Sequence, residues 1–292
     1  MSRLGFVGAG TVGTALAVSL AKRGFAVVAV GSRSKASAEG LAARIGGCAI
    51  YDDAQGVVDA ADLIFVTTPD DAIAPVVAEF AWRPGKAVVH CSGAASVDIL
   101  EPARKAGAQV GAFHPLQSFS SIEAAIANLP GSTFALEGAE PLLSQLKELA
   151  GALGGTVVVL KPGDKVLYHA AAVIACNYFY TLAKLSTDLW EQFGVSRADA
   201  LRALLPLIQG TVNNLANVGL PQALTGPIAR GDLGTIKAHL QALSQRAPEM
   251  VATYRELGLQ TIPLALGKGR IDAALAEAMR QLLKAELKSE TT

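Results

Sequence analysis

Three glycines near the N-terminus have the spacing of a phosphate-binding turn. Gly8, Gly10 and Gly13 form G-x-G-x-x-G, after an apolar run at residues 4–7 and before an apolar stretch of helical length. The first glycine permits a tight turn, the second lets backbone approach a pyrophosphate, and the third lets helix pack on strand. The amino end of the helix then offers free N–H groups to the phosphates. The spacing predicts a dinucleotide site formed by Gly8, Ala9, Gly10, Thr11, Val12 and Gly13.

The end of the next apolar run, residues 25–30, indicates which dinucleotide is bound. A site for NAD needs a carboxylate there for the ribose 2′-hydroxyl, and Gly31 stands in its place. Ser32 and Ser34 can donate hydrogen bonds, and the guanidinium of Arg33 can pair with a 2′-phosphate. A solvated polar loop is the plainer alternative, and a methyltransferase site would also need the missing acid. The absent acid and the adjacent base together favour NADP.

Further polar residues follow predicted strands at the edge where doubly wound sheets bind ligands. Thr67, Thr68 and Pro69 come at the end of one apolar run and are candidate cofactor contacts, or else an ordinary helix cap. Ser92 comes at the end of the next run. Its hydroxyl could bind a carbonyl or the nicotinamide amide, or it could cap a turn.

Two histidines and an asparagine are candidates for proton transfer and substrate contact. His114 follows another predicted strand, where it could act as a general acid near neutral pH or could hold its loop by packing. His169 and Asn177 interrupt an apolar helix, and steps of four residues drift by only about 40° each, so they share a helix face. They could contact the substrate or pair within the protein.

Length and composition restrict the class of protein. The chain has 292 residues, enough for two domains, and its net charge of +0 gives no electrostatic case for binding nucleic acid or an anionic membrane. The three cysteines suit a reducing compartment and lack metal-ligand spacing. No stretch before the first predicted strand is long enough for a signal peptide, so we expect a cytoplasmic protein. Because the cysteines lack ligand spacing, we also expect no metal.

One segment, residues 166–183, is uncharged and long enough to resemble a membrane span. It carries His169, Asn177 and three tyrosines, which are costly in hydrocarbon. We therefore expect it to be a buried helix of a soluble protein.

The pattern of elements changes once along the chain. Apolar strands alternate with helices as far as residue 160, which predicts an α/β class with a Rossmann-like, mostly parallel sheet. Lys-Pro-Gly-Asp at residues 161–164 ends this pattern, and only helices are predicted beyond it. We expect an NADP-binding Rossmann-like domain at 1–162 and an all-α domain at 163–292.

Six motifs together resemble a known family; they are GFVGAGTVG, DLIFVTTPDD, VVHCSGA, HPLQSF (114–119), YHAAAVIACNY (168–178) and ALTGPIARGD (223–232). The chain is similar to NADP-dependent oxidoreductases that join a Rossmann-like domain to a helical C-terminal domain catalogued as of unknown function. These belong to the 6-phosphogluconate dehydrogenase-like superfamily, with ketopantoate reductase and pyrroline-5-carboxylate reductase as relatives. The resemblance implies NADP(H) held between the domains, and a homodimer through the helical domain. It supplies no substrate.

The chain departs from the superfamily at one position. Hydroxyacid dehydrogenases of the superfamily have a catalytic Lys four residues before an Asn on the long interdomain helix. If the Asn is Asn177, the Lys position is Val173. Either His114 or His169 then replaces the Lys, or the reaction needs no strong side-chain acid.

Two functions are consistent with these patterns. One is an oxidoreductase that transfers a hydride between NADP(H) and a small carbonyl or imine, with substrate and direction left open. The other is a non-catalytic redox sensor that binds NADPH and signals through its helical domain. Because polar residues gather where the nicotinamide would lie, we favour the enzyme.

Overall fold

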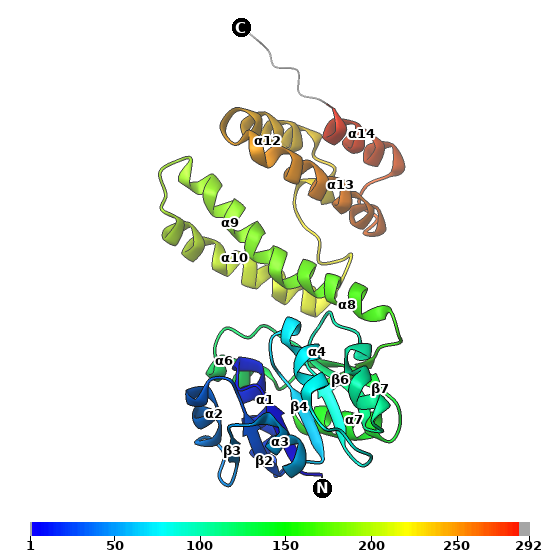
Figure 1. The fold of residues 1–292 in the computed structure, drawn as a ribbon. Coiled ribbons are helices and arrows are strands. Elements are labelled where there is room, and N and C mark those ends of the chain that lie inside the picture. The colour runs from blue at the N-terminus through cyan, green and yellow to red at the C-terminus, as the bar shows by residue number, and fades with distance from the viewer. Residues whose placement is uncertain (1, 286–292) are drawn as a thin grey trace. The chain divides into compact units, whose positions relative to one another are not determined.

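The computed structural model describes residues 2–285 and divides into two compact units, 1–177 and 178–292, which are treated separately below (Figure 1). The division comes later than the predicted boundary at 162/163. Helix α8 (Asp164–Ala172) and the π-helical turn η2 (Val173–Asn177) belong to the first unit. The reason is tertiary: Lys165 and Tyr168 of α8 pair with side chains of the sheet.

The first unit is built on an eight-stranded sheet of order β3-β2-β1-β4-β5-β6-β7-β8. Its strands are β1 Leu4–Val7, β2 Val27–Gly31, β3 Ala49–Tyr51, β4 Leu63–Val66, β5 Ala87–His90, β6 Gln109–Leu116, β7 Thr133–Gly138 and β8 Thr156–Val159. All neighbours are parallel except β6 and β7. The mostly parallel α/β fold is therefore confirmed, and the chain reverses direction once, at β7.

Helices cover both faces of this sheet. They are α1 Thr11–Ala21, α2 Lys35–Ala42, α3 Ala54–Ala60, α4 Asp70–Glu79, η1 Val97–Leu100, α5 Glu101–Lys105, α6 Ile122–Asn128 and α7 Leu142–Ala152. Alternate residues of β4 point to opposite faces, so Phe65 packs with α1, α2, α6 and α7, while Ile64 packs with α3, α4 and α5. These two buried layers hold the carboxyl ends of the strands in place.

The second unit consists of helices. They are α9 Tyr178–Glu191, α10 Arg197–Val218, α11 Pro227–Arg230, α12 Leu233–Arg246, η3 Pro248–Met250, α13 Val251–Gly267 and α14 Ala273–Lys284. Side-chain caps begin three of them, at Ser196, Asp232 and Asp272. One apolar cluster joins α12, α13 and α14 around Ile236, Leu240 and further buried residues. The helix-only character predicted for the C-terminal part is confirmed.

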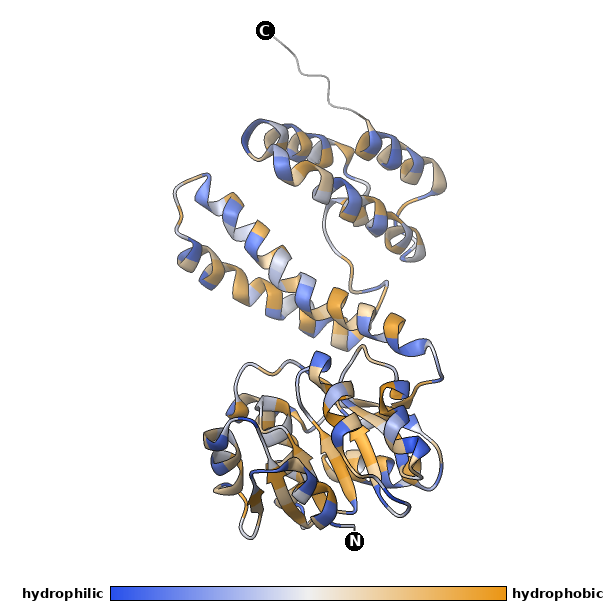
Figure 2. Ribbon diagram, viewed as in Figure 1, coloured by the Kyte–Doolittle hydropathy of each residue, from blue (hydrophilic) through white to orange (hydrophobic). Residues whose placement is uncertain are grey.

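The uncharged segment at 166–183 differs from the prediction. It lies in a continuous helical stretch, Asp164–Glu191, which is long and apolar enough to cross a membrane. The most apolar part of this stretch is 0% buried. Leu167 is 77% exposed and Ile174 65% exposed, and residues coloured hydrophobic recur along this stretch of the ribbon in Figure 2. The expected buried helix is therefore an exposed one within the single chain. Length and apolarity do not distinguish a membrane span from a helix that another protein covers.

Candidate functional site

The glycine turn has the geometry that its spacing predicts. Gly8 has φ +103°, and a Cβ there would lie 2.8 Å from the backbone of Thr67. A Cβ at Gly13 would collide with the carbonyl oxygen of Gly8 at 2.6 Å. At Gly10, by contrast, a Cβ would meet nothing within 4 Å, so this backbone faces open space at the amino end of α1. A phosphate can approach that backbone.

A cleft of about 710 Å³ opens beside this turn, at the carboxyl ends of β1, β2 and β4. Nine of the predicted cofactor residues line it: Gly8, Ala9, Gly10, Ser32, Arg33, Ser34, Thr67, Thr68 and Pro69. The other three, Thr11, Val12 and Gly13, belong to the first turn of α1 and do not line the cleft. The strand order reverses between β1 and β4, which is where doubly wound sheets bind ligands.

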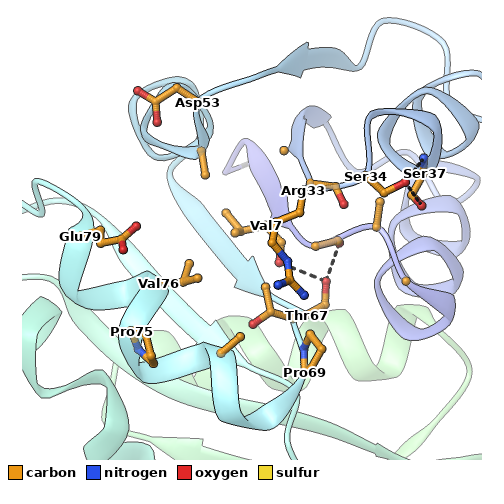
Figure 3. Close-up of a pocket in the computed structure, with 18 of the residues that line it drawn as sticks. Val7, Arg33, Ser34, Ser37, Asp53, Thr67, Pro69, Pro75, Val76 and Glu79 are labelled. Atoms are coloured by element: carbon orange, nitrogen blue, oxygen red, sulfur yellow. Dashed lines mark hydrogen bonds between the residues drawn. The ribbon is translucent and has the colours of Figure 1, made fainter.

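The polar groups of the cleft differ in how they are used. Arg33 extends into it, and Asp53 and Glu79 lie on the wall opposite Ser34 and Ser37 (Figure 3). Ser34 Oγ caps α2 by accepting hydrogen bonds from the backbone N–H and the hydroxyl of Ser37, at 3.2 and 2.9 Å. Its own hydroxyl proton remains available to a ligand. Ser37 is a lining residue that the sequence analysis missed, although it lies one helical turn from Ser34.

Two threonines at the end of β4 have different roles. Thr67 donates its hydroxyl to the carbonyl oxygen of Gly8 at 2.7 Å and so holds the glycine turn. The hydroxyl oxygen of Thr68 is buried and has no hydrogen-bond partner within the described chain, although Thr68 lines the cleft. A bound molecule would supply the missing partner. With the open backbone of Gly10, this orphaned hydroxyl fits a dinucleotide.

Ser92 is held within the protein. Its hydroxyl donates to Asp70 Oδ2 at 2.6 Å and accepts from the backbone N–H groups of Ala94 and Ala95 at 3.2 and 3.0 Å. The side chain is buried and its hydrogen-bonding capacity is largely filled. The alternative in which Ser92 caps a turn therefore describes its contacts better than direct substrate binding does.

The two candidate histidines come together from β6 and α8. The rings of His114 and His169 lie 6.3 Å apart, centroid to centroid. A Cβ at Gly93 would lie 2.6 Å from His169 Nδ1 and 2.8 Å from His114 Nε2, so the loop after β5 contacts both imidazoles. His114 Nδ1 is 2.8 Å from the hydroxyl of Tyr168, and their rings are edge-to-face at 5.6 Å. Sequence analysis missed Tyr168, although it precedes His169 directly.

Asn177 does not join this cluster in the described residues. It ends η2, a π-helical turn, and its side chain is exposed. The shared helix face of His169 and Asn177 stays a prediction.

A buried ion pair lies beside the histidines. Lys165 Nζ of α8 is 3.4 Å from Glu137 Oε1 of β7, and their side chains are 4% and 7% exposed. In the sheet, Ala112 of β6 pairs with His90 on one side and Glu137 on the other. Small Ala112 thus separates a buried imidazole from a buried carboxylate. Glu137 was visible as an acid within the apolar run FALEG, and Lys165 as a base four residues before His169.

Burial sets the protonation of these groups. It lowers the pKa of His114 to about 4, and the Lys165 cation and His169 contribute in the same direction. Burial likewise lowers the pKa of His90 to about 3, with help from Lys165, and raises the pKa of Tyr168 to about 12. The pKa of Lys165 is lowered by burial and raised by Glu137. His114 is therefore neutral at pH 7, which counts against the alternative in which it acts as a general acid near neutral pH.

Among residues 2–285, no three His, Cys, Asp or Glu side chains are grouped to hold a metal ion. The polar clusters described above are a phosphate-type cleft at the ends of β1, β2 and β4 and an uncharged Tyr–His group between β6 and α8. Such an arrangement can bind a dinucleotide and exchange a proton.

Comparison with known domains identifies both parts of the chain. Residues 1–115 match a Rossmann-like domain, and residues 132–261 match a domain of unknown function, DUF2520. The predicted combination of these two domains is confirmed. The second match begins at β7, so it includes the last strands of the sheet and α8. No curated protein matches the chain in sequence.

Solved structures share its fold over nearly the full length. Protein TM1727 from Thermotoga maritima is 29% identical with a TM-score of 0.73, covering 91% of this chain and 100% of that one. BF3122 from Bacteroides fragilis, assigned as an NADP oxidoreductase, is 26% identical with a TM-score of 0.70, covering 90% and 98%. A reductive aminase from Aspergillus terreus, in complex with NADPH and ethyl-5-oxohexanoate, is 17% identical with a TM-score of 0.61, covering 97% and 92%. This last likeness concerns the fold.

Proposed function

We propose that this chain, a Rossmann-like domain joined to a DUF2520 domain, is an NADP(H)-dependent oxidoreductase acting on a small carbonyl or imine. The observation that carries the proposal is the cleft beside the glycine turn, where Arg33 stands and no acid ends β2. NADP in the name of BF3122 and NADPH in the complex of the reductive aminase support the choice of cofactor.

Different residues of the cleft would bind different parts of the cofactor. The open backbone at Gly10 and the first turn of α1 would hold the pyrophosphate. Arg33, with Ser32 and Ser34, would hold the 2′-phosphate. The buried hydroxyl of Thr68 would form a hydrogen bond with another part of the cofactor. Bound NADPH would supply the hydride.

Reduction of a carbonyl also needs a proton, because the oxygen gains negative charge as the hydride arrives. The superfamily's Lys is replaced by Val173, and the groups gathered near the carboxyl end of β6 are His114 of that strand and Tyr168 and His169 of α8. This cluster is the source of the proton in our proposal. A carbonyl or an imine takes up both the hydride and this proton, which is why we propose this substrate class.

Arg33→Asp tests the choice of cofactor. Loss of the charged pair with the 2′-phosphate is worth about 1.5–3 kcal/mol, so NADPH affinity should fall roughly tenfold to a hundredfold and NADH affinity much less. Lys35→Asp makes the same charge change two residues away, outside the cleft lining, and should leave both affinities nearly unchanged. An equal loss for both dinucleotides in Arg33→Asp would contradict the proposal.

Turnover distinguishes the enzyme from the sensor. NADPH oxidation is measured with 2-keto acids, 3-keto acids and cyclic imines. Turnover with any of them supports the oxidoreductase. Tight NADPH binding without turnover, together with a partner protein captured only in the presence of NADPH, would favour the redox sensor instead.

We also propose that a second copy of the chain covers the exposed apolar side chains of the helical stretch Asp164–Glu191. Val166, Leu167 and Tyr180 there are 67%, 77% and 64% exposed, and soluble proteins rarely leave so large an apolar patch in water. Light scattering at micromolar concentration should give the mass of a homodimer. A monomeric mass would count against it, and flotation with lipid vesicles would then point to a membrane.

A further inference from the structure

Tyr168 occupies the position from which a proton could reach a substrate. Its hydroxyl is 2.8 Å from His114 Nδ1, and its ring meets the His114 ring edge-to-face. Both residues are half-buried, so the pair is shielded but accessible at the carboxyl end of β6. Gly93 lies against the other side of His114, at Nε2. The imidazole is thus enclosed between a glycine backbone and a phenol.

We propose that Tyr168 is the catalytic proton donor and that His114 is a positioning residue that holds its hydroxyl. The proposal rests on the oxidoreductase function proposed above and names the acid of that reaction. In this arrangement His114 donates its Nδ1–H to the phenol oxygen, which leaves the phenol proton free for the substrate.

The step is balanced without a further reactant. The carbonyl carbon gains the hydride, its π electron pair moves to the oxygen, and the Tyr168 O–H bond breaks as the new O–H bond forms. With an imine, the nitrogen takes the proton instead. The resulting phenolate keeps the hydrogen bond from His114 and regains a proton from water after the product leaves.

Availability of the proton favours Tyr168 over His114. A pKa of about 4 leaves roughly one His114 in 10³ charged at pH 7, so the imidazolium is scarce. The phenol, with a pKa of about 12, always carries its proton. It is still a much stronger acid than water, whose pKa is about 15.7, so transfer to an alkoxide is favourable.

The charges around His114 act in the same sense. Lys165 and His169 of α8 lower the pKa of His114, because they disfavour a positive charge on its imidazole. Asp70, at the start of α4, raises this pKa, but by less. Glu137 keeps Lys165 paired in the resting protein.

The second unit offers a matched control. Tyr254 of α13 makes the same kind of bond, with its hydroxyl 2.9 Å from Nδ1 of His239 and the rings 5.8 Å apart. Tyr168→Phe and Tyr254→Phe each remove one hydroxyl from one tyrosine–histidine bond. Thermal melting of both variants shows whether either loss affects folding beyond a few degrees.

The experiment compares NADPH oxidation by these variants over the 2-keto acids, 3-keto acids and cyclic imines. We expect Tyr168→Phe to lower kcat about 10²- to 10⁴-fold while NADPH affinity stays the same, and Tyr254→Phe to keep wild-type kcat. His114→Gln should lower kcat less. Combined with Tyr168→Phe it should add nothing, because it acts through the same hydroxyl.

Each other outcome overturns the proposal at an identifiable point. If the wild type turns over and Tyr168→Phe does so equally, Tyr168 is not the donor, although the oxidoreductase function stands. If His114→Gln alone abolishes turnover, or turnover of the wild type shows a step near neutral pH that His114→Gln removes, His114 is the donor. If the wild type oxidises NADPH with no compound, the oxidoreductase function and this inference both fail.

Discussion

The two tyrosine–histidine pairs of this chain have almost the same geometry in different surroundings. The hydroxyl of Tyr168 is 2.8 Å from Nδ1 of His114, and the planes of the two rings meet at 87°. The hydroxyl of Tyr254 is 2.9 Å from Nδ1 of His239, and their ring planes meet at 83°. His239 is exposed on α12, whereas His114 is half-buried at the end of a central strand. A hydrogen bond between the same two side chains therefore does not by itself define a site.

The difference lies in what surrounds each pair. Beside the first are the buried ion pair of Lys165 and Glu137, a second imidazole and a glycine loop. The second pair lines an apolar cleft of about 370 Å³ in the helical unit, with leucines and Phe193 among its neighbours. Only the first environment combines a buried cation with the ligand edge of a sheet. The comparison teaches that burial and nearby charge, rather than the pair itself, prepare a group for proton transfer.

The largest expected effect comes from breaking the ion pair that only the first Tyr–His pair has beside it. Glu137→Ala leaves the buried Lys165 without its carboxylate, which should lower the free energy of unfolding by about 3–5 kcal/mol. Glu101→Ala removes a carboxylate 2.7 Å from Arg104 in a pair whose side chains are 40% and 42% exposed, and should cost less than about 1 kcal/mol. Denaturant unfolding of both variants checks the contrast. Similar losses would mean that the pair at Lys165 is not buried in solution.

Acid should destabilise the protein through His114. Its folded pKa of about 4 lies below the ordinary value of 6.5, so in that window the unfolded chain binds a proton that the folded chain does not. Stability should fall as the pH drops from 6.5 to 4, by up to about 3 kcal/mol from this residue. His90 adds to the fall, with a folded pKa of about 3. His114→Gln should show a shallower decline in unfolding experiments across this range, and parallel curves would contradict the assignment.

The smallest effect should come from filling the space at Gly93. In Gly93→Ala the new Cβ would displace the imidazoles of His114 and His169. Overpacking of this kind lowers the free energy of unfolding by about 1–3 kcal/mol. Gly40→Ala in α2 meets nothing within 4 Å and should stabilise the helix by about 0.4–1 kcal/mol. The two changes should therefore have opposite signs in thermal unfolding. A neutral Gly93→Ala would show that the loop moves away from the histidines.

Local patterns in the sequence account for the cleft beside the glycine turn. The turn at Gly8, Gly10 and Gly13 depends on neighbours within six positions, and the polar residues after β2 and β4 follow from where apolar runs end. Nine of the twelve predicted cofactor residues line the cleft for that reason. Ser37 was missed because its role depends on the cap that Ser34 makes for α2.

The proton-transfer half was predicted only in part. His114 and His169 were candidates, and the structure brings them together, yet Asn177 stays apart and Ser92 is engaged by Asp70. Neither result could be read from spacing. One rests on the exposure of Asn177, and the other on a contact between residues 22 positions apart.

The sequence by itself determined the alternation of strands and helices up to residue 160, the glycine turn and the change to helices beyond it, because each depends on short-range periodicity and turn chemistry. The short strand β3 was not predicted. Tertiary structure decided the rest. The antiparallel pairing of β7 with β6 sets Glu137 beside Ala112 opposite His90, and α8 then brings Lys165 and Tyr168 to the same place. These partners are tens of residues apart, and their burial fixes which of them carries a proton. No local pattern encodes a pKa that depends on burial by distant parts of the chain.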